Sequence, residues 1–510
     1  MTTMCGTLGR GESAINLEGY RQGMKPSAGV AIVLGIFVIV APISAAPVTP
    51  RPSIIVVLTD DLDARSIAFM PQLKSLLADQ GLTFANFFVT TALCCPSRSS
   101  ILRGQYVHNH QVFTNTPPGG GFGKFHDLGH EQSTVATWLR TAGYRTGLMG
   151  KYLNGYPDRS APTYVPPGWD EWDSPARGGA YGNFNYTMNE TGKLVDYGNR
   201  PDDYLTDVLA RKAADFIRAS SRDGRPFFLY LATYAPHAPA TPAPRHQNAF
   251  ASVTAPRPPS FNEADVGDKP AWVRNRPSLS DQEMARIDRQ NRQRLRSLLA
   301  VDEMLAGLID VLRQTGQLDR TYVFFTSDNG YHMGEHRLMP GKNTAYEEDI
   351  RVPLLVRGPG VPAGRTIEHL ALNIDLAPTF AALAGATAPP FVDGRSLLPL
   401  LSPTAPPLLQ WRQAFTVEHY ADQSAEPGGA QPRQRRTRAA PELHALRTRT
   451  MLYVEYVTGE RELYDLQQDP YELQNRASTA APDLLARLSA RLAELQRCAS
   501  AGCRAAEDAP

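Results

Sequence analysis

Two short clusters of acidic and amide side chains offer oxygen ligands for a metal ion. Asp60 and Asp61 lie in Thr-Asp-Asp-Leu-Asp (59–63), and Asp328 and Asn329 lie in Ser-Asp-Asn-Gly (327–330). Carboxylate and amide oxygens suit calcium better than zinc, and the Cys and His spacing of a zinc site is absent from the sequence. An isolated Asp-Asp pair more often caps a helix. The two clusters therefore predict a calcium site only if the fold brings them together.

The elements that would do so are short apolar runs that end just before these residues. Asp60 follows residues 54–58 and Asp328 follows residues 322–325, both typical of buried strands. Lys151 follows residues 145–149, and His237 comes soon after residues 227–232. Ligands bind at the carboxyl ends of strands in open parallel sheets. Four polar clusters at four such ends predict one shared site.

Helical patterns alternate with these strands. Residues 71–79 fit a helix, and apolar residues from Leu298 to Leu312 recur at helical spacing before Gly316. Alternation of strands and helices predicts an α/β fold, with a mostly parallel mixed sheet covered by helices on both faces.

A proline- and leucine-rich stretch near residues 397–407 predicts a domain boundary. We expect a catalytic domain at 50–400 and a smaller C-terminal α+β subdomain at 401–510. In the smaller part the sequence predicts three strands, at 415–420, 451–457 and 463–464. It also predicts an exposed Gly/Pro/Arg-rich loop at 423–441 and a helix at 482–497.

The 510-residue chain has 42% apolar residues, 20% charged residues and a formal net charge of +1. These values are typical of a globular protein, and no overall charge favours nucleic acid as a partner. The apolar run Ala28–Ala46 resembles a secretory signal peptide, so residues 1–46 are expected to be removed, with Met24 a possible true start. We therefore expect a secreted or periplasmic protein without stable membrane insertion. The alternative is that the apolar run is retained as a membrane-anchoring helix.

The cysteines fall into two kinds. Cys498 and Cys503 are five positions apart and could close a small disulfide loop in an oxidising compartment, free thiols being the alternative. Cys94 and Cys95 are adjacent, and a bridge between them would require severe strain.

Cys94-Cys95-Pro96-Ser97-Arg98 is the most specific motif in the chain. Followed by Leu102 and Gly104, it resembles the sulfatase signature Cys-x-Pro-Ser-Arg, in which the first cysteine is oxidised to formylglycine after synthesis. The resemblance makes Cys94 the modified residue, although Arg103 replaces the usual threonine. It also implies a formylglycine-generating enzyme as a maturation partner.

The resemblance implies a sulfuric ester hydrolase with an alkaline-phosphatase-like fold. A sulfate monoester is anionic and repels nucleophiles; a hydrated formylglycine offers one hydroxyl that attacks sulfur and a second that later expels sulfate. The positions that match the family's calcium ligands are Asp60, Asp61, Cys94, Asp328 and Asn329.

Four cationic residues match the family's catalytic positions. The resemblance implies that Arg98 stabilises the hydrated aldehyde, that Lys151 and Lys342 hold sulfate oxygens, and that His237 protonates the leaving alcohol. Each residue taken singly is more often a surface group, so only the combined set predicts catalysis.

A narrower resemblance concerns Gly150-Lys151-Tyr152-Leu153-Asn154. Many arylsulfatases have Gly-Lys-x-His here, whereas this chain resembles the N-acetylglucosamine-6-sulfatase branch, which includes the extracellular heparan sulfate 6-O-endosulfatases. The usual elimination base is then missing, and His332 or His336 could replace it. The expected substrate is N-acetylglucosamine-6-sulfate or a related sulfated glycan.

Alternative functions remain open from the sequence. An arylsulfatase or a phosphonate or phosphate monoester hydrolase of the same superfamily would use a similar pocket. A non-catalytic binder of sulfated glycans would instead use an arginine-rich patch formed by Arg433, Arg435, Arg436 and Arg438.

Overall fold

The computed structural model describes residues 51–421 and 440–509, together with Gly23. The expected signal peptide and the arginine-rich patch therefore lie outside the described residues. Within the described ranges, none of the helices combines the length and apolar character that crossing a membrane requires.

A ten-stranded mixed sheet forms the centre of the fold, in the order β11-β2-β10-β9-β1-β8-β4-β5-β6-β7. Its middle strands β9, β1, β8, β4 and β5 are parallel. Antiparallel pairs join β10 to β9 and to β2, and join β5, β6 and β7. The strand bounds are β1 Ser53–Thr59, β2 Leu82–Phe84, β4 Arg145–Gly150, β5 Glu171–Gly178, β6 Tyr186–Glu190, β7 Lys193–Tyr197, β8 Phe227–Ala232, β9 Thr321–Ser327, β10 Leu354–Arg357 and β11 Arg365–Ile367.

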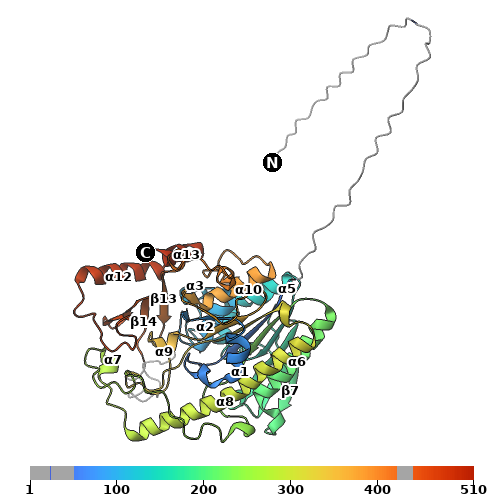
Figure 1. Ribbon diagram of the computed structural model, residues 1–510, viewed down its shortest axis with the longest axis horizontal. Helices are drawn as coiled ribbons and strands as arrows, with labels where there is room; N and C mark the ends of the chain where they lie inside the picture. The colour runs from blue at the N-terminus through green and yellow to red at the C-terminus, as the bar shows by residue number, and fades with distance from the viewer. Residues whose placement is uncertain (1–22, 24–50, 422–439, 510) are drawn as a thin grey trace, which may run out of the picture. The chain divides into compact units, whose positions relative to one another are not determined.

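Helices cover both faces of this sheet, as the sequence predicts (Figure 1). Ile54, Val56 and Leu58 of β1 belong to one apolar core, whereas Ile55 and Val57 belong to the other. The first core is completed by α2 (Cys94–Arg103), α5 (Val135–Thr141) and α10 (Leu376–Ala384), and the second by α6 (Leu205–Asp223) and α8 (Asp281–Gln314). Alternation along a strand sends successive side chains to opposite faces, which explains the two cores.

Several elements differ in length from their sequence prediction. The predicted helix at 71–79 is a short α-helical segment, α1 (Pro71–Leu73), which continues as a π-helical segment at Lys74–Ala78. The helix around Leu298 begins much earlier, because Ser280 and Glu283 form a capping box. Shorter elements are β3 Phe87–Phe88, α3 Val107–His110, α4 Gly121–Asp127, α7 Ala271–Arg274, α9 Glu347–Ile350 and β12 Ala371–Leu372.

The C-terminal region has its own four-stranded antiparallel sheet, β13-β14-β15-β16. Three strands were predicted and β14 was missed; the bounds are β13 Ala414–His419, β14 Leu443–Thr448, β15 Met451–Tyr456 and β16 Arg461–Asp465. One face packs against the first core, where the ring centroids of Phe88 and Phe415 are 5.1 Å apart. Helix α12 (Pro482–Leu495) covers the other face. The predicted Cys498–Cys503 disulfide is present and links Cys498, which follows α12, to Cys503 within α13 (Ala501–Asp508).

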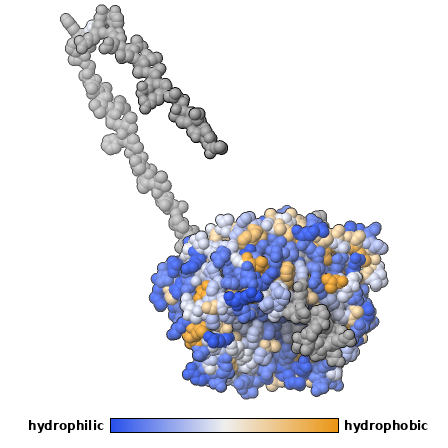
Figure 2. Space-filling model, turned by 180° about the vertical axis from the view of Figure 1, so that it is seen from behind, coloured by the Kyte–Doolittle hydropathy of each residue, from blue (hydrophilic) through white to orange (hydrophobic). Residues whose placement is uncertain are grey.

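The surface is mainly hydrophilic. Figure 2 shows small, separate apolar areas on the face opposite to that in Figure 1. The exposed large apolar side chains among the described residues are Leu128, Leu398, Leu409, Val457 and Tyr471. Isolated residues of this kind are ordinary on globular proteins and need no partner to explain them.

Candidate active site

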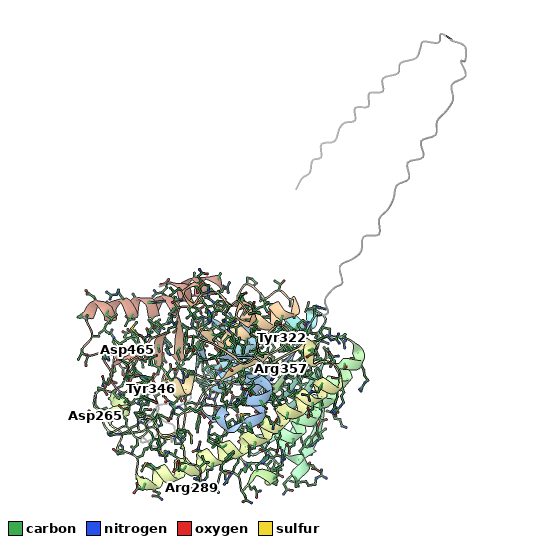
Figure 3. All side chains as sticks on the ribbon, in the orientation of Figure 1. Asp265, Arg289, Tyr322, Tyr346, Arg357 and Asp465 are labelled. Atoms are coloured by element: carbon green, nitrogen blue, oxygen red, sulfur yellow. A yellow bond between two sulfur atoms is a disulfide. The ribbon has the colours of Figure 1, made fainter. Side chains whose placement is uncertain are left out.

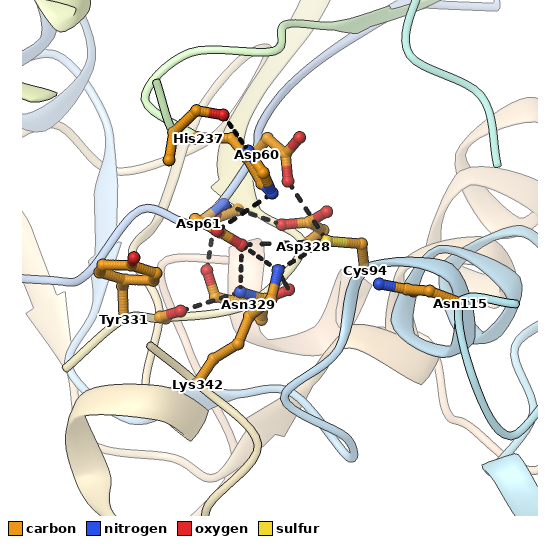
Figure 4. Close-up of polar contacts among 12 residues, drawn as sticks. Asp60, Asp61, Cys94, Asn115, His237, Asp328, Asn329, Tyr331 and Lys342 are labelled. Atoms are coloured by element: carbon orange, nitrogen blue, oxygen red, sulfur yellow. Dashed lines mark hydrogen bonds and ion pairs between the residues drawn. The ribbon is translucent and has the colours of Figure 1, made fainter. Parts of the chain in front are cut away.

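The two acidic clusters meet at the carboxyl edge of the sheet, as predicted from their positions after β1 and β9 (Figure 4). The backbone N–H of Asp61 donates to Oδ1 of Asp328 over 3.1 Å. The Nδ2 atom of Asn329 donates to Oδ1 of Asp61 over 2.7 Å. All four side chains, including Asp60, are buried. Parallel pairing of adjacent strands brings together residues that are about 270 positions apart.

Cys94 is the first residue of helix α2 and is fully buried beside these carboxylates. Its Sγ atom lies 3.4 Å from Oδ1 of Asp60 and 3.9 Å from Oδ1 of Asp61. The unsatisfied N–H groups in the first turn of α2 give this position a positive partial charge, which favours an anionic ligand. Burial raises the pKa of the Cys94 thiol to about 12, so the unmodified thiol would be protonated at neutral pH.

Arg98 lies one turn further along α2. Its Nε donates to Oδ2 of Asp328 over 2.8 Å, and its Nη1 donates to the carbonyl oxygen of Lys151 over 2.8 Å. Its Nη2 is buried and has no hydrogen-bond partner in the described part of the chain. An unpaired guanidinium donor at full burial indicates a place for an acceptor oxygen.

Lys151 and Lys342 bring two further charges into the site. The Nζ of Lys151 lies 2.6 Å from Oδ2 of Asp60. The Nζ of Lys342 contacts Oδ1 of Asp61 and lies 2.7 Å from the Sγ of Cys94. Burial opposes the charge on both ammonium groups, but Asp60 and Asp61 raise both pKa values well above the usual range. Both lysines are therefore cationic at neutral pH.

His237 lies at the open side of the site, with 26% of its side chain exposed. Its Nε2 atom is 3.6 Å from Oδ2 of Asp61, and its ring packs on Tyr181 at 4.6 Å between centroids. Its Nδ1 atom contacts the backbone oxygen of Ala238 over 2.7 Å, so that Nδ1 donates and Nε2 faces the site. A group placed in this way can transfer a proton at the rim.

The carboxylates at the centre suit a cation chemically. Burial raises the pKa of Asp328, and Asp60 adds to that effect by repulsion. Burial also opposes ionisation of Asp60, but Lys151 and other cations hold its pKa far below the usual range. Three buried carboxyl groups and one amide oxygen form a hard-oxygen donor set of the kind calcium prefers, and position 94 lies beside them. Asp60, Asp61, Asp328 and Asn329 could therefore hold this ion.

Sequence reasoning missed three residues of the site. Arg294 of α8 donates from Nη2 to the backbone oxygen of Asp61 over 2.6 Å. Asn115 accepts the backbone N–H of Cys95 over 2.8 Å, and Tyr181 lies under Lys151 as well as His237. Only Arg294 had a signal in the sequence, because a charged residue occupies the buried stripe of α8 four positions before Leu298.

The two histidines considered as elimination bases are engaged elsewhere. His332 is buried, and its Nδ1 contacts Oδ1 of Asp349 over 2.9 Å while its Nε2 contacts the backbone oxygen of Met339 over 3.0 Å. The Nδ1 of His336 contacts Oε2 of Glu263 over 2.7 Å. Leu153, where many arylsulfatases have histidine, belongs to the first apolar core. Each histidine therefore uses its Nδ1 atom to pair with a carboxylate outside the Asp60–Asp328 cluster.

Solved structures place this fold in a known class. A solved structure described as a protein in complex with its substrate, D-glucosamine-2-N,6-O-disulfate, is 25% identical and superposes with a TM-score of 0.71, covering 88% of this chain and 98% of that chain. A phosphonate monoester hydrolase from Silicibacter pomeroyi has a TM-score of 0.68 at 24% identity, covering 88% and 95%, and shows the fold alone. The protein therefore has the alkaline-phosphatase-like α/β fold of sulfatases, as predicted.

Sequence comparisons define the family. The sulfatase family model matches residues 52–386, and the model described as N-sulphoglucosamine sulphohydrolase, C-terminal, matches residues 334–498. Human N-acetylglucosamine-6-sulfatase is 39% identical over 89% of this chain and 86% of its own length. An arylsulfatase of Volvox carteri is 34% identical over 91% and 77%. The chain belongs to the sulfatase family and is a sulfuric ester hydrolase.

Proposed function

We propose that this sulfatase hydrolyses the 6-O-sulfate of a glucosamine-type sugar, using formylglycine at position 94 and a calcium ion held by Asp60, Asp61, Asp328 and Asn329. The observation that supports the mechanism most directly is the position of Cys94. It lies at the N-terminus of α2, 3.4 Å from Asp60 and 2.7 Å from Lys342, at the edge of the sheet where the Asp60–Asp61 and Asp328–Asn329 clusters meet.

Formylglycine would supply a geminal hydroxyl as nucleophile and a second hydroxyl for release of sulfate, and calcium would supply Lewis-acid stabilisation of negative charge. The chain's own residues orient these groups. Hydrogen bonds to Asp328 and to the Lys151 carbonyl oxygen fix the Arg98 guanidinium, so its unpaired Nη2 is already held in place before substrate binds. Such preorganised donors stabilise charge that develops in the transition state.

The buried cationic groups bind the sulfate group of the substrate. Lys151, Lys342 and the N-terminus of α2 surround the position of the Cys94 side chain with positive charge. Both lysines are held by aspartates, which keeps them charged despite burial. His237 faces the site from its exposed side, where the alcohol part of the ester must lie, and it is the group placed to protonate that alcohol.

The proposed substrate class is supported by similar known proteins and by the loop after β4. N-acetylglucosamine-6-sulfatases are 38–39% identical to this chain over 84–90% of its length. In the loop, Asn154 donates from Nδ2 to the Tyr181 hydroxyl over 3.3 Å, next to His237. A cavity of about 140 Å³ is lined by Lys151, Asn154, Arg177 and Tyr181, among others, and offers polar groups to a sugar ring.

We also propose that the protein acts outside the cytoplasm, after maturation by a formylglycine-generating enzyme. The Cys498–Cys503 disulfide supports this location, because reducing compartments rarely preserve structural disulfides.

A substrate panel tests the proposal. The specificity constant kcat/KM should be measured on N-acetylglucosamine-6-sulfate, a heparin-derived oligosaccharide, nitrophenyl sulfate and nitrophenyl phosphate, at one pH and calcium concentration. After correction for leaving-group reactivity, the amino-sugar 6-sulfates should be preferred. Preference for nitrophenyl sulfate would make the protein a general arylsulfatase, and preference for the phosphate would contradict sulfate ester hydrolysis as its main activity.

A further inference from the structure

Three side chains outside the active site lie close together, and each has a buried polar atom without a hydrogen-bond partner among the described residues. They are His336, which follows β9, Glu348 of α9 and Glu472, which follows β16. One ligand atom of each lies within 4.8 Å of the other two. The Nε2 of His336, Oε2 of Glu348 and Oε1 of Glu472 are buried and have no hydrogen-bond partner among the described residues. Three unsatisfied polar atoms in one such cluster would be costly without a shared partner.

The remaining polar atoms of the same side chains are already used. Glu263 accepts from the Nδ1 of His336 over 2.7 Å and is itself paired with Lys269 at 3.1 Å. Arg65 donates to Oε1 of Glu348 over 2.8 Å. The backbone N–H of Glu347 donates to Oε2 of Glu472 over 3.2 Å. In each side chain one polar atom is thus used in a hydrogen bond, and the other polar atom is available to a ligand.

The histidine has the arrangement of a metal-bound imidazole. Because the Glu263 carboxylate accepts from Nδ1, the proton lies on Nδ1 and the lone pair of Nε2 is free. Metal-binding histidines commonly donate their other ring N–H to a carboxylate in this way. Tyr346, labelled in Figure 3, stacks on the same imidazole at 4.1 Å between ring centroids and fixes its plane.

The carboxylates also favour a cation. Glu472 is only 1% exposed, and burial together with repulsion from Glu348 and Glu347 raises its pKa well above the usual range. A proton on Glu472 would neutralise that group but would leave Oε2 of Glu348 without a partner. One divalent cation neutralises both carboxylates and satisfies all three atoms.

We propose that His336, Glu348 and Glu472 bind a divalent transition-metal ion of the zinc type, separate from the active-site calcium. An imidazole nitrogen with two carboxylates is a donor set that zinc accepts readily, with water as a fourth ligand, whereas calcium prefers oxygen ligands alone. An entry path exists, because Glu348 and the two residues before Glu472 line a cavity of about 390 Å³.

The ion would join two parts of the chain. Glu472 belongs to the C-terminal region, and His336 and Glu348 are at the two ends of the segment that carries Lys342. Metal bound there would fix both ends of that segment, and with them the lysine that contacts Cys94. Its role is therefore to position Lys342 and to hold the C-terminal sheet in place.

Metal analysis of the full-length, calcium-saturated protein tests the site. After equilibration with zinc and dialysis, the wild type should retain one zinc per chain, and Glu472→Gln should retain none. Glu494→Gln is the matched control, because Glu494 is an exposed carboxylate on α12 and makes the same change of charge. Glu263→Gln should bind zinc about 10–100-fold more weakly. Zinc should raise the Tm of the wild type and of Glu494→Gln, but not that of Glu472→Gln.

X-ray absorption at the zinc edge gives a test on the wild type alone, which does not depend on the folding of a variant. The expected shell has one nitrogen and several oxygens at about 2.0–2.2 Å and no sulfur. A sulfur ligand would indicate binding at unmodified Cys94 and would overturn the assignment. Failure of the wild type to retain zinc, equal zinc in Glu472→Gln and Glu494→Gln, or retention of calcium in place of zinc would also overturn it.

Discussion

The Nζ atom of Lys342 lies 2.7 Å from the Sγ atom of Cys94, although the two residues are 248 positions apart. The same ammonium group contacts Asp61 and lies 3.5 Å from Oδ1 of Asn329. One lysine thus joins the residue proposed to carry the nucleophile to the residues proposed to bind calcium. Its charge is maintained by Asp61 despite burial.

Replacing this lysine by methionine keeps an unbranched stem but removes the charge. We expect Lys342→Met to lower kcat/KM on a sulfate ester about 10²–10³-fold, because a preorganised charge near the developing anion is lost. Lys193→Met is the control, since Lys193 is exposed on β7. Full activity of Lys342→Met in a folded protein would contradict a role in sulfate binding.

The modification at position 94 can be observed directly. Peptide mass spectrometry of active enzyme should find an aldehyde at Cys94, and Cys94→Ala should be inactive while it remains folded. Cys95→Ala should keep most of the activity, because Cys95 occupies the variable position of the motif and its contact with Asn115 is made by the backbone N–H, which alanine keeps. An enzyme that is fully active with a thiol at position 94 would exclude this mechanism.

Calcium removal should affect activity and stability together. Three buried carboxyl groups remain without a divalent partner after chelation, so we expect turnover to cease and the Tm to fall. Calcium at about 100 times its Kd should contribute about 2.7 kcal/mol to the free energy of unfolding. Calorimetry and activity assays before and after calcium is restored measure both effects. Unchanged turnover after verified removal of the metal would exclude the proposed ligands.

The role of His237 can be separated by leaving group. His237→Ala should slow hydrolysis of a sugar 6-sulfate about 10²–10⁴-fold, the range for loss of a general acid, because an alkoxide needs protonation as it leaves. A nitrophenyl sulfate should be affected much less, since nitrophenolate leaves without a proton. Equal losses on both substrates would instead indicate that His237 only packs against Tyr181 and Asp61.

Stability should decrease on acidification through buried neutral histidines. Burial lowers the pKa of His419 from 6.5 to about 4. Between these values the unfolded chain binds a proton that the folded protein does not, so stability falls as pH falls through this window. One such site changes the free energy of unfolding by at most about 1.4 kcal/mol per pH unit. His419→Gln should show a shallower decline in calorimetry from pH 6.5 to 4; an identical decline would contradict the neutral state of His419.

Sequence reasoning recovered the central strands and the residues at their ends. The apolar run 54–58 is β1, residues 322–325 lie in β9, and Asp60 and Asp328 follow them as expected. It did not locate β14 or the antiparallel edge strands of the mixed sheet, because strands such as β7 are partly exposed and have weak alternation. It also gave no reason to connect Glu472 with His336, which lie more than a hundred positions apart.

The chemistry available to this protein can be recognised in its amino-acid sequence: a cysteine motif, oxygen ligands after strands, and a lysine in each of two later motifs. Local spacing is sufficient there, because a strand and the residues at its end are adjacent in the chain. Which of these groups share a site depends on how the chain packs in three dimensions. This packing fixes Arg98 with a free Nη2 atom, engages His332 with Asp349, and brings Glu472 beside His336. Those relationships depend on helix and sheet packing between distant segments, which no local pattern encodes.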